Sequence, residues 1–343
     1  MTKLLYLSCH QTLEYDEIKT FHELGFDVFS VGYYTEPANP VNYTRKKLNI
    51  PVDPELVKKV KSLPGFNPGH PVQLTKEIVD PFDVIVCSHF VENLELNWPL
   101  FADKVVIRRA IAQGNGSYES RFKKYRDAGI YTVRVSKNER TLPNFAGEDC
   151  IIYGSVDPDE LYGWVGDEIS VLTVQKWMKR HPKHTRFDAY DIVTKPFNRK
   201  LLGKENHDVP WAESDVTYER LIECLQRARV YFSSCSRPAA FTYTFQEAWI
   251  MGCPVVTFGP KLGNFHTNHD GKMYTVHEFI ENEVTGFWSD DLNKLQQYIL
   301  VLLNNHELAK GISAAGRKRA IELFHPNKIK QDWKDFFKYI GVL

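Results

Sequence analysis

Short apolar runs alternate with helix-like stretches along most of the chain. In the first half, the runs that predict strands cover residues 3–8, 26–31, 83–87, 104–107, 130–135 and 150–153. A helix that begins near Leu13 is expected to end before Gly25, because glycine is favoured at the left-handed position that follows a helix. Near-continuous apolar strands separated by helices are typical of a parallel sheet that is covered on both faces.

A turn-rich passage, residues 154–166 (GSVDPDELYGWVG), interrupts this pattern and predicts a linker. The alternation then restarts, with predicted strands at 169–174, 200–202, 230–233 and 254–258. The predicted helices of this half cover 217–227, 245–251, 291–304, 306–323 and 327–339. Two successive series of strands and helices therefore predict an α/β protein with two Rossmann-like domains, residues 1–165 and 166–325.

Composition and charge fit a globular protein and exclude several classes. The 343 residues, of which 43% are hydrophobic, suit two domains better than one. Lysine and arginine together number 43, as do aspartate and glutamate, so no net charge attracts nucleic acid or an anionic membrane. No apolar stretch approaches the ~18 residues of a membrane span. The first apolar run is too short for a signal peptide, and we expect it to be a buried strand.

The cysteines and histidines give no metal or disulfide pattern. The six cysteines are scattered without a CxxC pair, so we expect reduced core residues in a cytoplasmic protein. The histidines that lie close together in sequence lack a cysteine or carboxylate that would complete a ligand set, and we expect no metal site. These histidines are His181 and His184, and His266, His269 and His277.

Several common α/β enzymes are excluded by absent motifs. The first predicted strand leads into Ser8-Cys9-His10-Gln11 rather than a GxGxxG turn, which a dinucleotide oxidoreductase needs near the pyrophosphate. A P-loop and a GxSxG elbow are also absent, which excludes P-loop NTPases and α/β-hydrolases.

The most informative segment covers residues 230–258 (VYFSSCSRPAAFTYTFQEAWIMGCPVVTF). The pattern predicts a strand, a loop, a helix and a second strand. The loop 236–243 directly precedes the helix, so backbone amides and the positive end of the helix form an anion site that suits a diphosphate. Glu247, early in the helix, is well placed to bind a pair of sugar hydroxyls such as those of a ribose.

This segment resembles the group-1 (GT4-like) family of GT-B glycosyltransferases. The family motif E-A-M-x-x-G-x-P-V-V is similar to residues 247–256 (EAWIMGCPVV), and its ENGVTGF turn is similar to residues 281–287 (ENEVTGF). The closing helices are also similar, so the resemblance covers residues 230–324 closely and the rest in pattern only. It implies a GT-B fold with the active site in the cleft between two Rossmann-like domains. The resemblance further implies that 1–165 binds the acceptor, that 166–325 binds the donor, and that a C-terminal helix, 326–343, crosses back to the first domain.

The activity that the resemblance implies is a retaining transfer of a hexose or pentose from a nucleotide sugar, most often a UDP-sugar, to a hydroxyl acceptor, without a metal cofactor. Its donor-binding residues correspond to Thr242, Tyr243 and Glu247. An arginine and a lysine of the family neutralise the leaving diphosphate, and Arg180 and Lys183 are the candidates here, among the basic residues that follow the first strand of the second domain.

Candidates in the first domain follow predicted strands. The family often ends a strand with a histidine that touches the transferred sugar, and His89 occupies that place. Ligands of α/β proteins bind at the carboxyl ends of strands. For the same reason His10, Gln11 and Arg109 are candidates for contact with the acceptor or the sugar.

The chain departs from the family at one donor position. A glutamate eight residues before the helix glutamate usually contacts the donor sugar, and Ala239 stands there. In addition, residues 241–243 (FTY) replace the usual F-G-L, whose amides hold the distal phosphate. The identity of the donor sugar is therefore open.

The acceptor and the oligomeric state are not assigned by the sequence. A glycan or a small molecule is the first hypothesis. A second is modified DNA, as for phage-type transferases that act on hydroxymethylated bases, since the basic clusters 121–126 (RFKKYR) and 195–204 (KPFNRKLLGK) could follow phosphates. A third is a non-catalytic module that binds nucleotide sugars.

Overall fold

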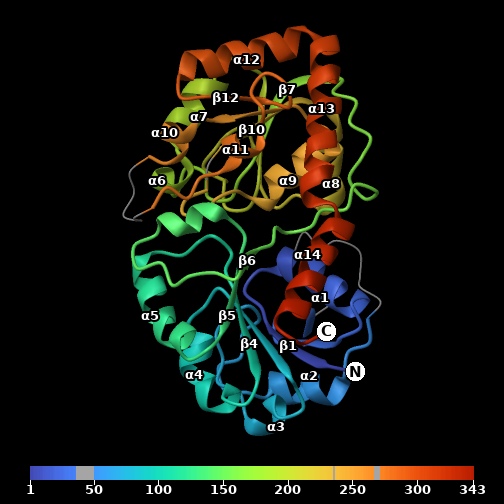
Figure 1. The fold of residues 1–343 in the computed structure, drawn as a ribbon. Helices are drawn as coiled ribbons and strands as arrows, with labels where there is room; N and C mark the ends of the chain where they lie inside the picture. The colour runs from blue at the N-terminus through green and yellow to red at the C-terminus, as the bar shows by residue number, and fades with distance from the viewer. Residues whose placement is uncertain (36–49, 235, 266–270) are drawn as a thin grey trace. The chain divides into compact units, whose positions relative to one another are not determined.

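The computed structural model describes residues 1–35, 50–234, 236–265 and 271–343, and these form two compact units. The first unit comprises Met1–Ser155 together with Pro326–Leu343, and the second comprises Val156–His325 (Figure 1). Each is described by itself below. Among the described residues, no helix is both long and apolar enough to cross a membrane.

The first unit is built on a six-stranded sheet in which every strand pair is parallel. The order is β2-β1-β3-β4-β5-β6. The strands are β1 (Lys3–Leu7), β2 (Asp27–Ser30), β3 (Val84–Ser88), β4 (Val105–Arg109), β5 (Tyr131–Arg134) and β6 (Cys150–Ile151). The helices are α1 (Gln11–Glu23), α2 (Pro54–Lys61), α3 (Lys76–Val79), α4 (Glu92–Phe101), α5 (Gly116–Asp127) and, from the C-terminus, α14 (Pro326–Tyr339), with short 3-10 turns at Tyr33–Thr35 and Lys137–Thr141.

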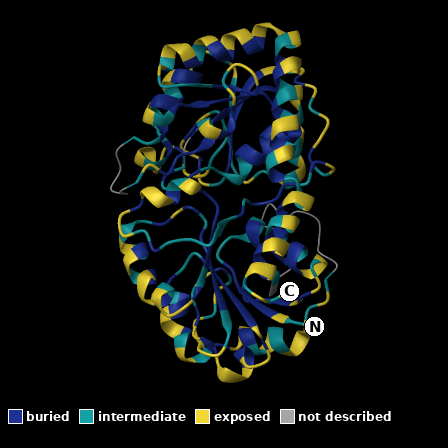
Figure 2. Ribbon diagram, in the orientation of Figure 1, coloured by how far each residue is buried: buried dark blue, intermediate teal, exposed yellow. Residues whose placement is uncertain are grey.

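Apolar cores cover both faces of this sheet. One core includes Leu5 and Ile85, and the other includes Leu4 and Val84, because successive side chains of a strand point to opposite faces. Helix α14 belongs to the second of these cores, where Trp333 is fully buried and packs edge-on against Phe21 at 4.8 Å. Figure 2 shows the strands as the buried layer and the outer sides of the helices as exposed.

The second unit has a parallel sheet of the order β12-β11-β10-β7-β8-β9. Its strands are β7 (Glu168–Val174), β8 (Arg199–Leu202), β9 (Ala212–Glu213), β10 (Ala228–Ser233), β11 (Val255–Phe258) and β12 (Phe287–Ser289). Its helices are α6 (Pro182–Thr185), α7 (Phe187–Thr194), α8 (Tyr218–Arg227), α9 (Tyr243–Met251), α10 (Pro260–Gly263), α11 (Val276–Phe279), α12 (Leu292–Asn304) and α13 (His306–Phe324).

Residues of the segments 247–256 and 281–287 hold helix α9 in place. Gly252 ends α9 with a φ of 97°, which glycine adopts without strain. The buried Trp249 of α9 donates a hydrogen bond of 3.0 Å from its indole nitrogen to the carbonyl of Thr285, in the 281–287 turn. At Gly316 of α13 a Cβ atom would lie 2.7 Å from the Trp249 nitrogen, so glycine permits this close packing. These residues therefore fix the position of α9 in the second unit.

Candidate active site

Each sheet contains a point at which the strand order reverses. In the first unit this point lies between β1 and β3, and in the second between β7 and β10. Ligands of open α/β sheets bind outside the carboxyl ends of the strands at such a point. The segments that matter are therefore the residues after these four strands, and most of the candidates from the sequence lie in them.

In the second unit, the loops after β7 and β10 are tied together. The side-chain amide of Gln175 lies 3.4 Å from the hydroxyl of Ser236. The backbone N–H of Arg237 donates to the carbonyl of His184 at 2.8 Å, and a ring nitrogen of His184 lies 3.0 Å from the carbonyl of Arg237. The loop after β7, which carries the predicted cations, thus lies beside the loop that leads into α9.

The amino end of α9 is formed as an anion site requires. Thr242 is the N-cap, and its hydroxyl accepts a hydrogen bond of 3.2 Å from the N–H of Phe245. Tyr243 is the first helical residue, and the hydroxyl of Thr244 lies 3.3 Å from that of Tyr231 on β10. Glu247 lies one turn into the helix and is 6% exposed. The structure thus places Thr242, Tyr243 and Glu247 within the cap and the first five residues of one helix.

The basic residues after β7 differ in their surroundings. Lys176 is the second residue after the strand; its side chain reaches solvent, yet desolvation by the surrounding protein and the charge of Lys204 lower its pKa. Arg180 is exposed and forms an ion pair of 3.1 Å with Glu205. Lys183 lies in the short helix α6 and is exposed. Lys176 is the cation next to the strand end, a position that the sequence did not single out.

In the first unit, the residues after β1 and β3 meet at the reversal point. The thiol of Cys9 lies 3.2 Å from the hydroxyl of Ser88. His10 is the N-cap of α1, and its Nδ1 accepts a hydrogen bond of 3.4 Å from the N–H of Leu13. Gln11 is the first residue of that helix, and both His10 and Gln11 are partly exposed. The structure therefore places His10 and Gln11 at the same sheet edge as His89.

His89 directly follows β3 and is held in a defined conformation. Its φ is 56°, its N–H donates to the carbonyl of Arg109 at 2.9 Å, and its ring stacks on Tyr118 with 5.4 Å between centroids. Tyr118 in turn lies under Arg121, which is paired with Glu92 and Glu95. Desolvation, and secondly the charge of Arg108, lower the pKa of His89 to about 4, against a smaller opposite effect of Glu92. His89 is therefore neutral at ordinary pH.

Arg109 was predicted to contact the acceptor or the sugar, and this prediction is wrong. Its side chain is fully buried, and its guanidinium donates to Glu17 at 2.6 Å and to the carbonyl of Arg134 at 3.2 Å. It also lies over the ring of Trp333. Because β4 is covered on both faces, its last residues point into the interior of the unit and do not face a ligand.

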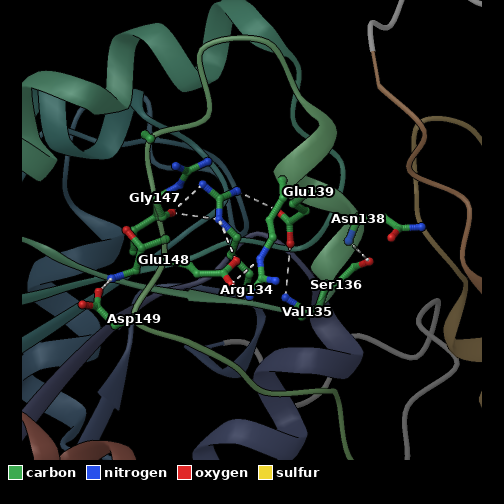
Figure 3. A network of polar contacts seen from close by, with 12 residues as sticks. Arg134, Val135, Ser136, Asn138, Glu139, Gly147, Glu148 and Asp149 are labelled. Carbon is green, nitrogen blue, oxygen red and sulfur yellow. Dashed lines mark hydrogen bonds and ion pairs between the residues drawn. The ribbon is translucent and has the colours of Figure 1, made fainter.

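The neighbouring Arg108 points to the opposite face and joins a second buried charge network. Glu119 receives hydrogen bonds from Arg108 at 2.5 Å and from Arg134 at 2.7 Å, and Arg134 also pairs with Glu139 at 3.0 Å. Figure 3 shows the Arg134 side chain between Glu139 and the carbonyl of Gly147. Desolvation acts to raise the pKa of Glu119, but the two arginines outweigh it and hold this pKa at about 2.

Ala239, the departure from the family, lies in the loop between β10 and α9. Its side chain is buried, and its N–H donates to the carbonyl of Ser236 at 2.8 Å. The next residue, Ala240, accepts a hydrogen bond of 3.0 Å from the N–H of Thr275. The position is therefore in a fixed, internally bonded loop beside the α9 end.

The cysteines and histidines of the described residues give no metal cluster. No group of three or more histidine, cysteine or acidic residues could hold a metal ion in this part of the chain, although His266 and His269 lie outside it. Cys87, Cys224 and Cys253 are buried and unbridged, Cys9 and Cys150 are partly exposed and unbridged, and Cys235 lies outside the described residues.

The two basic clusters are largely paired with acidic side chains. In 121–126, Arg121 pairs with Glu92 and Glu95, and the remaining pairs are Lys123 with Asp127 and Arg126 with Asp149. In 195–204, the pairs are Arg199 with Asp191 and Lys200 with Glu168. These pairs neutralise part of the positive charge that a phosphate backbone would contact.

Two parallel Rossmann-like units form the GT-B fold, as the sequence predicted. The last helix, α14, belongs to the first unit, whose first segment ends at Ser155, whereas the sequence placed the domain boundary after residue 165. No family model and no curated protein matches the sequence.

Solved structures match over nearly the whole chain. Sucrose-phosphate synthase of Thermosynechococcus elongatus has a TM-score of 0.67 at 15% identity and covers 99% of both chains. HepE of Anabaena in complex with UDP-glucose has a TM-score of 0.69 at 13% identity, covering 99% of this chain and 100% of that one. A glycosyltransferase of Rickettsia africae has a TM-score of 0.67 at 16% identity, covering 99% of this chain and 98% of that one. At these identities the likeness concerns the fold.

Proposed function

We propose that the protein is a glycosyltransferase that moves a sugar from a nucleoside diphosphate carrier to a hydroxyl group. The observation that carries the proposal is the second unit's strand-order reversal, where α9 presents a capped amino end and the buried Glu247 beside a loop rich in cations. A helix amino end suits a diphosphate, and a carboxylate one turn later suits the two hydroxyls of a ribose. The GT-B neighbours agree with this reading, since three of the matching HepE structures hold UDP-glucose, UDP with glucose, or UDP.

We assign the donor to the second unit and take UDP as its nucleotide. Glu247 would accept hydrogen bonds from the ribose, and the amides of Tyr243 and its neighbours would hold the distal phosphate. Lys176, Arg180 and Lys183 would balance the diphosphate charge. The similarity to the group-1 family in residues 247–256 and 281–287 supports this assignment.

In the reaction, the bond between the sugar's anomeric carbon and the β-phosphate oxygen breaks. A bond from that carbon to the acceptor oxygen forms, and the proton of the acceptor hydroxyl passes to the leaving diphosphate. Negative charge develops on the leaving diphosphate, so fixed cations and helix amides beside it lower the barrier. We propose retention of configuration, as in the resembling family.

The first unit would bind the acceptor, which we propose to be a glycan or a small molecule. His10, Gln11 and His89 lie together at its sheet edge. The neutral ring of His89 can donate or accept a hydrogen bond to a sugar hydroxyl without adding charge.

The proposal is tested by nucleotide binding and by hydrolysis of a panel of nucleotide sugars. Glu247→Gln keeps the size of the side chain but removes its charge. It should weaken UDP binding by about one to two orders of magnitude, because charge-assisted hydrogen bonds to the ribose are lost. The matched control is Glu223→Gln, which changes an exposed glutamate of α8 that pairs with Arg220. It should leave UDP binding unchanged.

A wild-type protein that binds no nucleotide would overturn the proposal. Binding without hydrolysis or transfer would identify a non-catalytic module. If Glu247→Gln lowered the melting temperature strongly while UDP affinity stayed normal, Glu247 would be a structural residue of α9.

A further inference from the structure

Trp177, the third residue after β7, has an unusual backbone conformation. Its φ is 52°, in the left-handed region that bulky residues rarely occupy. Such an outlier persists only where the surrounding structure holds it, and outliers concentrate at ligand sites.

The surroundings that hold this conformation are centred on the fully buried Asn206. Its side-chain amide donates to the carbonyls of Gln175 at 2.7 Å and Gly203 at 2.9 Å, and its oxygen accepts from the N–H of Met178 at 2.7 Å. The N–H of Trp177 itself donates to the carbonyl of Lys204 at 3.2 Å. The chain is thus fixed on both sides of Trp177 against the loop after β8.

The loops after β7 and β8 pack so closely that the backbone around Trp177 is held in one conformation. Gly203 has a φ of 133°, and a Cβ atom on it would lie 2.5 Å from the carbonyl oxygen of Gln175. The residue after Trp177, Met178, is fully buried. The contacts of Asn206, Gly203 and Lys204 therefore turn the side chain of Met178 inward and the indole of Trp177 outward.

The indole is one of the large apolar side chains that the structure leaves open to solvent, with 44% of its surface exposed. Within the described part of the chain its ring partner is His181, which meets it edge-on at 85° with 5.7 Å between centroids. Exposed cations flank it in sequence, namely Lys176, Lys179 and Arg180. A flat aromatic face beside positive charges matches a ligand that is itself flat at one end and anionic at the other.

We propose that Trp177 is a stacking platform for the base of the nucleotide donor, which rests on the proposed function. Base stacking on an aromatic side chain is strong and tolerates different bases, because every base has a π-face. The neighbouring cations fit the diphosphate of the same ligand. A glycan acceptor would also stack on an indole, but it carries no diphosphate for the neighbouring cations to contact.

The test compares a ligand with a base and a ligand without one. Trp177→Gly suits the left-handed backbone, so it should fold at least as well as the wild type. Its affinity for UDP should fall by roughly 5- to 100-fold, whereas its affinity for inorganic pyrophosphate should not change. Trp177→Phe should retain part of the UDP affinity. In the wild type, UDP should quench tryptophan fluorescence, and this quenching should be much smaller in Trp177→Phe.

Tyr162→Ala is the matched control, because it removes another exposed ring of the same unit. It should leave UDP binding unchanged. Equal losses of UDP and pyrophosphate affinity in Trp177→Gly would overturn stacking of the base, and so would an unchanged affinity for UDP. A wild type that binds neither ligand would instead overturn the proposed function.

Discussion

The carboxyl edges of the two sheets use positive charge in opposite ways. At the first edge, Arg108 and Arg109 end strand β4 and are buried against Glu119 and Glu17. At the second edge, cations such as Lys176 stand in the loop after β7 and reach solvent. Positively charged side chains therefore lie in the interior of one unit and reach solvent in the other.

The difference follows from where each cation lies relative to its strand. A residue within a strand of a doubly covered sheet points into one core or the other, so a charge there needs a counter-charge at once. A charged residue in the loop beyond the strand reaches solvent, so water hydrates its charge and no buried counter-charge is required. A cation within a strand therefore indicates a structural role, whereas a cation just past a strand is a candidate for ligand binding.

The largest expected effect is on the interior network. Glu119→Ala should lower the free energy of unfolding by about 3–5 kcal/mol, because it leaves Arg108 and Arg134 as buried charges without their shared partner. Chemical denaturation at neutral pH measures this. Asp127→Ala breaks the exposed pair with Lys123 and should change stability by less than about 1 kcal/mol. Equal effects of the two variants would remove the contrast between interior and surface charge.

The second effect concerns the exposed cations. Lys176→Ala should lower kcat by roughly 10²-fold or more, because charge on the leaving diphosphate is no longer balanced. Arg180→Ala should lower kcat less, since Arg180 is shared with Glu205. Arg180→Lys should recover only part of the loss, because it lacks the planar fork. Steady-state kinetics at saturating donor measure the effect. Arg227→Ala is the control, because it removes an exposed arginine that pairs with Asp167 outside the loop after β7, and it should leave kcat unchanged. Wild-type turnover in both variants would exclude these cations from the site.

The strands could be predicted because their patterns are local. Strand β3 is a run of buried apolar residues, and the Gly25 signal after α1 corresponds to an observed φ of 92°. The donor motif was equally local, since Thr242 and Glu247 lie in one loop and helix.

The features that escaped prediction depend on distant contacts. Arg109 was misassigned because its partner Glu17 is 92 positions away and no local pattern joins the two. A charged residue inside an apolar strand was the available signal, since it demands a buried partner. Trp177 escaped because its signal is a backbone angle imposed by Asn206, which the sequence does not show. Helices α4 and α7 escaped because proline in α4 and a short length in α7 obscure their periodicity.

A smaller effect is expected at Ala239. Ala239→Glu restores the carboxylate of the resembling family, so preference should move toward ordinary UDP-hexoses by about tenfold, the size of one charge-assisted hydrogen bond. Ala239→Gln has the same size without the charge and should give less of the change. A donor panel compares kcat/KM for each UDP-sugar. If the wild type already prefers UDP-glucose and Ala239→Glu only loses activity, the missing carboxylate does not indicate an unusual donor.

The smallest effect on activity near neutral pH is expected from His89, because its low pKa keeps it from changing charge in that range. With a pKa of about 4 in the folded protein, His89 stays neutral from pH 8 down to about pH 5, so kcat/KM should show no step from this residue near its ordinary value of 6.5.

The free energy of unfolding, by contrast, should depend on the protonation of His89. The unfolded chain takes up a proton on this histidine below about pH 6.5, whereas the folded protein does so only near pH 4. The contribution to stability is therefore complete above pH 6.5 and is lost as the pH falls toward 4. His89→Gln should therefore lose less stability over that interval than the wild type. Tyr118→Leu, which removes the stacked ring and so admits water, should raise the pKa of His89 toward 6.5. Titration of the His89 ring by NMR gives the pKa directly, and a value near 6.5 in the wild type would contradict the desolvated, neutral histidine that distinguishes the first edge from the second.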